Sequence, residues 1–183
     1  MRWPLDVPDE LSTERVSVRR YQSDDASHLF LALSDDRVWE HIPRAVPTTA
    51  LELDAVIRSG LATGNRITFT IREGGEIVGV TSFIFDPADP EGVEIGATQL
   101  STSVWGTGVN GAAKRLLISL AFDQGAAWIQ FRTDERNARS AAAIAKLGAD
   151  DLGTRQDTLV RRDGSLRRSW FFRLRPSSWR PLQ

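Results

Sequence analysis

The segment WGTGVNGAAKRLL, residues Trp105–Leu117, joins a glycine-rich turn to the start of an amphipathic helix. Its three glycines, Gly106, Gly108 and Gly111, are spaced as G-x-G-x-x-G. The first N–H groups of a helix have no partner within the helix, and they lie at the positive end of its dipole. The segment therefore predicts a site for a pyrophosphate group.

Three kinds of ligand carry such a pyrophosphate: a dinucleotide, a nucleoside triphosphate and coenzyme A. A dinucleotide site also needs an acidic residue about 20 positions further along the chain, and Asp134 follows Gly111 by 23 residues (134 − 111). A nucleoside triphosphate loop needs Gly-Lys followed by Ser or Thr. That pattern is missing from the segment.

The surroundings of the glycines argue against the dinucleotide. The residues that lead toward the turn, Ser101-Thr102-Ser103, are polar, whereas the strand before a dinucleotide turn is buried and apolar. The pattern before the turn predicts antiparallel strands, and the pattern after Asp134 predicts a hairpin instead of further parallel units. A dinucleotide-binding protein therefore remains the less favoured alternative.

Length and composition are those of an ordinary globular protein. The chain has 183 residues, 41% of them hydrophobic, and a formal net charge of −1. These values predict one domain over residues 1–183, and they give no support for binding to nucleic acid. No apolar run approaches the roughly 20 residues of a membrane helix, and the N-terminus MRWPLDVPDE does not resemble a signal peptide. We expect a cytoplasmic protein with no membrane contact.

The absence of cysteine limits the chemistry. It excludes disulfides, a thiol nucleophile and thiolate metal sites. The only histidines are His28 and His41, too few for a histidine-rich metal site. We therefore expect no metal cofactor.

Hydrophobic periodicity predicts the order of the elements. Residues 1–14 are expected to be a polar lead-in, and Asp163-Gly164 is a strong hairpin signal. Residues 66–98 predict three antiparallel strands. The other expected elements are a strand near 16–18, helices starting near 23 and near 48–49, a loop at 39–49, a helix after the glycines, a strand at 128–132, a helix from 137 to 148, and two strands near 158–161 and 166–174.

This order of elements resembles the GNAT acetyltransferases, and the detail resembles the subgroup of RimJ/RimL-like ribosomal-protein N-terminal acetyltransferases. In that family the pyrophosphate loop has the pattern Q/R-x-x-G-x-G/A, which corresponds here to the run from Ser103 to Gly108. The subgroup often has Trp before the first glycine, as at Trp105. Ser103 replaces the usual Gln or Arg, and Ala112 stands where Glu is frequent.

A second stretch carries the same resemblance. Asn137-Ala138-Arg139-Ser140, followed by Lys146-Leu147-Gly148-Ala149, is similar to the family's N-x-x-S and K-x-G-F patterns, with Ala149 in place of Phe. The resemblance covers roughly residues 12–180. It implies an α+β fold of the GNAT acyl-CoA N-acyltransferase type, with a mixed central sheet flanked by helices. That sheet combines an antiparallel meander with one parallel crossover.

The resemblance implies acetyl-CoA as co-substrate. Its pantetheine arm would enter a gap between the strand of Glu94 and the strand of Trp128, and Asn137 would both cap a helix and contact the cofactor. The residues expected to pair with pantetheine are Gln99, Leu100 and Ser101. Those whose backbone N–H groups would hold the pyrophosphate are Thr107, Gly108, Val109, Asn110, Gly111 and Ala112.

The reaction that the resemblance implies is acetyl transfer to a primary amine. Without cysteine, we expect direct attack by the amine in a ternary complex. Glu94 is the best candidate for the base that takes the amine's proton, with a salt-bridged strand residue as the alternative. Many family members carry a Tyr where Ile144 stands, and Ser140 is the nearest residue that can hydrogen-bond the leaving sulfur. Ser140 can also be a simple first-turn helix residue.

The acceptor and the oligomeric state stay open. In this family the loop between the first two helices shapes the acceptor site, which suggests Trp39 and His41 as substrate-binding residues, although a packed loop with a surface His is the favoured explanation for each residue taken singly. The acceptor can be a protein N-terminus, a small amine or an antibiotic. Alternatives are a catalytically silent acyl-CoA-binding module, suggested by Ile144 and Ala149, and a dimerisation protein in which the aromatic-rich final hairpin forms a homodimer.

Overall fold

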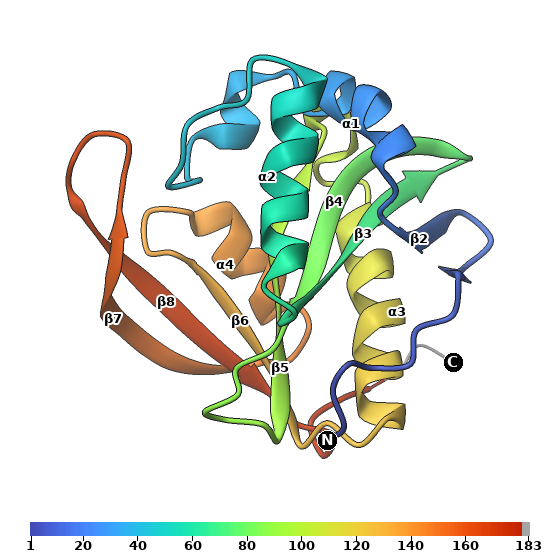
Figure 1. Cartoon of the computed structure of the whole chain (residues 1–183). Helices are drawn as coiled ribbons and strands as arrows, with labels where there is room; N and C mark the ends of the chain where they lie inside the picture. Colours follow the sequence, from blue (N-terminus) through green and yellow to red (C-terminus); the bar gives the residue numbers. More distant parts are fainter. Residues whose placement is uncertain (181–183) are drawn as a thin grey trace.

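The computed structural model describes residues 1–180, except for the side chain of residue 157. One eight-stranded sheet, with the order β1-β2-β3-β4-β5-β6-β8-β7, runs through the middle of the molecule between α2 and α3 (Figure 1). The strands are β1 (Glu10–Ser12), β2 (Val16–Arg20), β3 (Arg66–Glu73), β4 (Glu76–Ile84), β5 (Gly92–Leu100), β6 (Trp128–Asp134), β7 (Asp150–Val160) and β8 (Leu166–Leu174). The α-helices are α1 (Ala26–Ala32), α2 (Ala50–Ala62), α3 (Val109–Asp123) and α4 (Ala138–Ala145).

The sheet is mixed, as the resemblance implied. Strands β1 to β5 form antiparallel neighbours in chain order, β5 pairs in parallel with β6, and β8 pairs antiparallel with both β6 and β7. The parallel pair needs a crossover connection, and α3 supplies it between β5 and β6. This arrangement confirms the expected α+β fold, with an antiparallel meander and one parallel crossover in a sheet flanked by helices.

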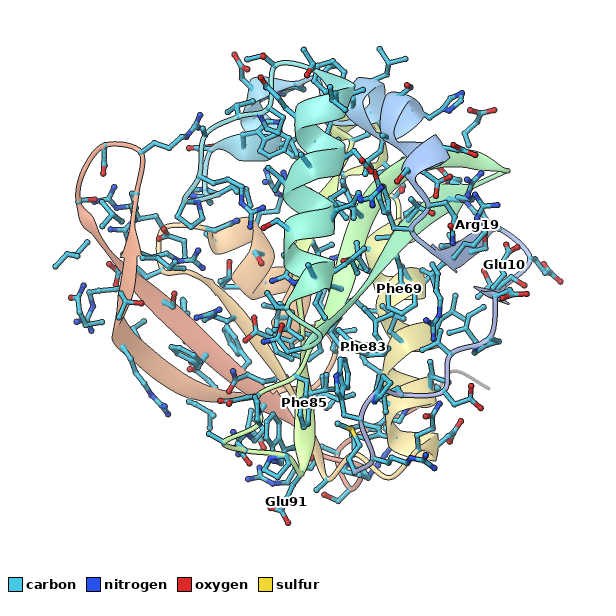
Figure 2. The ribbon with its side chains drawn as sticks, in the orientation of Figure 1. Glu10, Arg19, Phe69, Phe83, Phe85 and Glu91 are labelled. Atoms are coloured by element: carbon cyan, nitrogen blue, oxygen red, sulfur yellow. The ribbon has the colours of Figure 1, made fainter. Side chains whose placement is uncertain are left out.

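Two hydrophobic clusters pack on opposite faces of the sheet. The larger joins α3 and α4 to the face that carries Phe69 and Phe83 (Figure 2). These two rings pack edge to face, with their centroids 5.4 Å apart. The smaller joins α1 and α2 to the other face through Ile77 and Val80. Residues that alternate along a strand point to opposite faces, so strands covered on both sides are apolar or uncharged nearly throughout, as β4 is from Ile77 to Phe83.

Side-chain caps set several helix starts. The Thr49 hydroxyl accepts from the Glu52 backbone N–H at the start of α2, and Asn137 Oδ1 accepts from the Ser140 backbone N–H, 3.0 Å away, at the start of α4. The cap expected at Asn137 is therefore confirmed. Helix α3 differs because its N-cap is Gly108, which has no side chain to cover the first N–H groups.

Three local expectations were wrong. The lead-in contains the short edge strand β1 and two buried side chains, Leu5 and Val7, because three residues are too few to show an alternating pattern. Strand β7 begins at Asp150, well before the expected start near residue 158. Its first half is polar and exposed and shows no alternating pattern, so only its pairing with β8 makes it a strand. The first helical turn expected from Ser23 is a separate 3₁₀ turn, Ser23–Asp25.

In the part of the chain that the structure describes, no helix is both long enough and apolar enough to span a membrane.

Candidate active site

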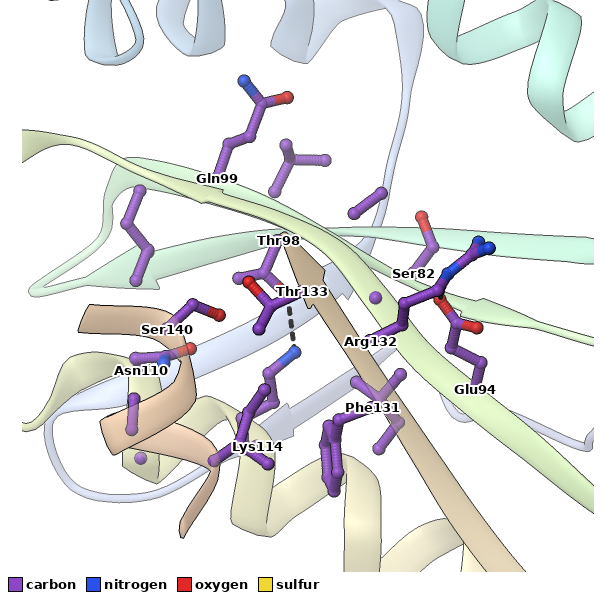
Figure 3. Close-up of a pocket in the computed structure, with 18 of the residues that line it drawn as sticks. Ser82, Glu94, Thr98, Gln99, Asn110, Lys114, Phe131, Arg132, Thr133 and Ser140 are labelled. Carbon is purple, nitrogen blue, oxygen red and sulfur yellow. Dashed lines mark hydrogen bonds and ion pairs between the residues drawn. The ribbon is translucent and has the colours of Figure 1, made fainter. Parts of the chain in front are cut away.

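Strands β5 and β6 part in the middle of the sheet. Their paired residues run only from Gly92 with Trp128 to Glu94 with Gln130, although both strands continue beyond that row. A cleft of about 1280 Å³ opens there, and its walls come from β4, β5, β6, α3 and α4. The gap expected between the Glu94 strand and the Trp128 strand is thus present, and Figure 3 shows residues that line the cleft.

A backbone irregularity places the β5 side chains around this opening. Ala97 has a φ of 52°, and the register between β4 and β5 shifts between Val80 and Ser82. An extra residue of this kind re-aims the side chains that follow it. As a result Thr98 and Gln99 both line the cleft although they are neighbours in the chain.

The glycine turn leaves a row of backbone N–H groups open to this cleft. Gly106 and Gly108 have φ values of 77° and 92°, which favour glycine, and a Cβ built at either residue or at Gly111 would have no atom within 4 Å. The N–H of Ala112 donates to Gly108 O, and that of Thr107 donates to Val104 O at a long 3.4 Å. Among the described residues, no hydrogen bond uses the N–H groups from Gly108 to Gly111. Of these four residues, Gly108, Asn110 and Gly111 line the cleft, and Val109 is buried behind them. The row is therefore shorter than the expected span from Thr107 to Ala112.

Two buried side-chain atoms of residues that line the cleft have no hydrogen-bond partner in the described structure. They are Gln99 Nε2, a donor, and Asn110 Oδ1, an acceptor, and both residues line the cleft. Buried polar atoms are normally paired, so an unpaired donor and acceptor in one cleft point to a ligand that carries amides. Coenzyme A has amides in its pantetheine arm and a pyrophosphate for the N–H row, and the residues present fit it.

Not every expected cofactor or acceptor residue faces the cleft. Ser101 directs its N–H to Val78 O on β4, and Val109 is 1% exposed in the core. Trp39 is 3% exposed, and its Nε1 donates to Leu33 O, 2.7 Å away, inside the smaller hydrophobic cluster. Thr107 is exposed on the turn, outside the cleft lining. The residues that do line the cleft are Gln99, Leu100, Gly108, Asn110, Gly111, Ala112, Asn137, Ser140, Glu94 and His41.

Glu94 lies at the row where β5 and β6 part. Its carboxylate accepts from Gln130 Nε2 at 3.2 Å and lies 3.6 Å from Arg132 Nε, with 13% of the side chain exposed. A Cβ at Gly96 would come within 2.7 Å of Glu94 Oε1, so the missing side chain of Gly96 makes room for the carboxylate. Glu94 is thus held at the cleft by two neighbours on β6, in an arrangement that suits either a base or a salt-bridged strand residue.

Ser140 lies at the other end of the cleft, near Asn110 (Figure 3). Its backbone N–H donates to Asn137 Oδ1, the helix cap. Within the described residues, the Ser140 hydroxyl makes no hydrogen bond. Ile144, one turn further along α4, is buried and also lines the cleft. The hydroxyl of Ser140 is therefore free to contact a ligand in the cleft.

Asp134, the acidic residue of the dinucleotide pattern, already forms an ion pair with Arg161. Arg161 binds it with two hydrogen bonds, Nε to Oδ2 at 2.7 Å and Nη2 to Oδ1 at 2.9 Å. A carboxylate paired in this way cannot also accept from a ribose hydroxyl without losing its own ion pair. Together with the antiparallel strands before the turn, this pairing removes the support for the dinucleotide alternative.

Lys114 is a cleft residue that the sequence did not single out. It is 5% exposed, and its ammonium donates to Thr98 Oγ1 at 2.5 Å and to Thr81 Oγ1 at 3.2 Å, as the dashed line in Figure 3 shows for Thr98. Burial lowers the pKa of Lys114 from 10.5 to about 7, and attraction to Glu94 opposes that change only in part. Its position four residues after Asn110, on the same helix face and beside the buried Ala113, was the available signal.

The depressed pKa of Lys114 predicts how stability depends on pH. Between about pH 7 and pH 10.5 the unfolded chain binds this proton and the folded protein does not, so the free energy of unfolding rises with pH. Across this window the free energy of unfolding of the parent should rise by up to about 1.4 kcal/mol per pH unit more than that of Lys114→Met. Urea unfolding of both proteins at pH 7, 8 and 9 measures the difference, and parallel pH curves would contradict it.

Several proteins of known structure share this architecture, whereas the sequence has no significant match among curated proteins. A putative acetyltransferase from T. thermophilus superposes with a TM-score of 0.84 at 28% identity, over 95% of this chain and 93% of that one. The ribosomal-protein-S5-alanine acetyltransferase from Vibrio fischeri has a TM-score of 0.76 at 19% identity, over 96% and 100% of the two chains. RimJ from Mycobacterium smegmatis, in complex with CoA-disulfide, has a TM-score of 0.76 at 19% identity, over 88% and 82%.

The sequence also matches a family model. The model describes an acetyltransferase (GNAT) domain, and the match covers residues 15–150, which include the parted strands, the glycine turn and α4. Because the match spans most of the chain, the protein belongs to the GNAT family of acetyl-CoA-dependent N-acetyltransferases.

Proposed function

We propose that this protein transfers an acetyl group from acetyl-CoA to a primary amine by direct attack in a ternary complex. The observation that carries the proposal is the row of unused N–H groups from Gly108 to Gly111, which opens onto a cleft between parted strands. The unpaired atoms of Gln99 and Asn110 support it, because they match the amides of a pantetheine arm.

Each end of the cleft has its own task in this proposal. The N–H row holds the pyrophosphate, and Gln99 and Asn110 orient the pantetheine arm along β5. When bound, acetyl-CoA supplies an activated acetyl group as a thioester. The Ser140 hydroxyl donates a hydrogen bond to the sulfur as the carbon–sulfur bond breaks, and Glu94, at the other end of the cleft, accepts through water the proton that the amine loses as its nitrogen bonds to the acetyl carbon.

The structural relatives support this assignment at the level of the ligand. The RimJ structure was solved with CoA-disulfide, and the Vibrio fischeri protein is named for an alanine of ribosomal protein S5. At 19% identity these relatives share the fold, so a protein N-terminus is one acceptor to test beside small amines.

Binding of acetyl-CoA tests the proposal. In calorimetry we expect a Kd within the range of about 1 µM to 1 mM that enzyme substrates show. NAD serves as the control, because it carries a pyrophosphate but no pantetheine. Binding of NAD together with no heat from acetyl-CoA up to about 1 mM would overturn the proposal.

A catalytically silent acyl-CoA-binding module is the second candidate. The observation that favours it is Ile144, which lines the cleft with an apolar side chain where relatives of similar sequence carry a phenolic acid. Release of the free thiol from acetyl-CoA in the presence of a panel of amines and peptides separates the two candidates. Binding without thiol release favours the silent module.

A further inference from the structure

Arg66 and Glu94 lie in one row across the sheet. Arg66 on β3 pairs with Ile84, Ile84 pairs with Glu94, and Glu94 pairs with Gln130. Directly paired residues on neighbouring strands point to the same face. With neighbouring strands about 4.8 Å apart, the Arg66 and Glu94 backbones are about 10 Å apart across β4. Arg132 follows Gln130 by two residues and shares its face.

This face is opposite the one that α3 covers. Val93 and Ile95 alternate with Glu94 and belong to the hydrophobic cluster that contains α3. The glycine turn and the N–H row stand at the start of α3, on that same side of the sheet. The row of Arg66 and Glu94 therefore approaches the cleft from the side away from the pyrophosphate site, where an acceptor has room to enter.

The Arg66 side chain is seated between β3 and α2. A Cβ at Gly60 on α2 would come within 3.2 Å of Arg66 Cδ, so the glycine lets the arginine stem pass against the helix. Arg66 is half-buried and lines the cleft, and no hydrogen bond or ion pair joins its side chain to any described residue. Burial, together with repulsion from Arg44 and Arg132, lowers the pKa of Arg66, and Glu94 opposes the change.

The charges at this end of the cleft do not balance. Among the described residues, the charges that act most on Arg66 are those of two guanidinium groups, Arg44 and Arg132, and of one carboxylate, Glu94. The carboxylate is already engaged by Arg132 and Gln130; Figure 3 shows Arg132 beside Glu94. A half-buried guanidinium loses part of its hydration, and an anionic group bound in the cleft would replace it.

We propose that the acceptor is a primary amine that carries a carboxylate, and that Arg66, assisted by Arg44, binds this carboxylate. The proposal rests on the acetyl transfer proposed above and names its substrate class. A guanidinium presents two parallel N–H donors that match a carboxylate. The carboxylate can belong to a small amino acid-like amine or to an acidic residue next to the N-terminus of a peptide.

The same charges explain why a plain amine is a poor acceptor here. An ammonium group that enters beside Arg66 and Arg44 is repelled by their guanidinium groups, and a carboxylate on the same molecule offsets the repulsion. Once the carboxylate is bound, the nearby arginines still favour the neutral form of the amine. That neutral form is the nucleophile, and its proton passes to Glu94 when the new C–N bond forms.

Two matched pairs of acceptors test the proposal with the full-length protein and acetyl-CoA. The small-molecule arm compares β-alanine with β-alaninamide, and the peptide arm compares a peptide starting Ser-Glu with one starting Ser-Gln. Thiol release gives kcat/KM, corrected for the fraction of free amine. We expect the carboxylate to raise kcat/KM by about 10- to 100-fold in at least one arm, the range for one charge-assisted hydrogen-bonded pair.

Variants of Arg66 test whether this residue causes the preference for acceptors that carry a carboxylate. Arg66→Gln should lower the preference about tenfold, and Arg66→Glu should reverse it, because each removes the cation that the carboxylate needs. Arg162→Gln is the control, since Arg162 is exposed at the β7–β8 turn and outside the cleft lining. If a variant does not fold, the ratio of kcat/KM between the members of each acceptor pair, measured with the parent protein, still tests the proposal.

Each remaining outcome has one meaning. Equal rates with both members of both pairs overturn the carboxylate proposal and leave acetyl transfer standing. A tenfold weaker Kd for acetyl-CoA in Arg66→Gln also overturns it, because the anion that Arg66 binds would then belong to coenzyme A. No thiol release with any amine contradicts the proposed function itself.

Discussion

Replacing Glu94 by Gln is expected to lower kcat for acetyl transfer by about 10²- to 10⁴-fold, the usual contribution of a positioned base. Gln keeps the size of the side chain and one oxygen for the hydrogen bond that Gln130 Nε2 now donates at 3.2 Å. It cannot take a proton from the amine. The binding of acetyl-CoA should change little, since the pyrophosphate and pantetheine contacts lie on other residues. Thiol release measured from pH 6 to pH 9 checks the rate.

The control for this experiment is Glu91→Gln. Glu91 immediately precedes β5, is exposed and lies outside the cleft lining, so its loss of charge should leave kcat within about twofold. A Glu94→Gln protein that is as fast as the parent throughout the pH range would show that Glu94 is a structural ion-pair residue and that water removes the proton.

Gly111→Asp is expected to weaken acetyl-CoA binding by about 100-fold while the protein becomes no less stable. Gly111 is the third residue of α3, and a Cβ there meets no atom within 4 Å. A carboxylate in this position faces the pyrophosphate across a few ångströms, and like charges at that separation repel by roughly 1–4 kcal/mol. The same carboxylate stabilises the helix start by about 0.3–1 kcal/mol. Calorimetry and urea unfolding measure the two effects separately.

Gly111→Ala is the matched control for charge. A methyl group enters open space, and removing the glycine from a helix should raise stability by about 0.5–1 kcal/mol. Affinity for acetyl-CoA should stay near that of the parent. If Gly111→Asp binds acetyl-CoA as tightly as Gly111→Ala does, the pyrophosphate lies elsewhere and the start of α3 is only a structural turn.

Much of the fold follows from local patterns in the chain. The alternation in β3, the Asp163-Gly164 turn and the cap at Asn137 each depend on residues close together in sequence. The short β1 and the first half of β7 do not, because they exist only through pairing with β2 and β8. Edge strands of this kind carry little periodicity, since one of their neighbours is solvent.

The candidate site was predictable where its chemistry lies in the backbone. Gly106 and Gly108 indicate a turn with free N–H groups whatever surrounds them, because only glycine adopts their backbone angles without strain. Side-chain roles were harder to predict. Trp39 was expected at the acceptor site and lies in the core, since a loop residue's direction depends on what packs above it.

Spacing along the chain was thus enough to predict the order of elements and the pyrophosphate turn, and the resemblance to the GNAT family rested on that order and its motifs. Only the tertiary structure showed that Lys114 is buried beneath Thr98, and that Arg66, Glu94 and Arg132 gather at one end of a cleft. Arg66 and Arg132 are far apart in the sequence and come together because register across the sheet sets which side chains share a face. Charge balance within a cleft is a property of that register, and no local pattern encodes it.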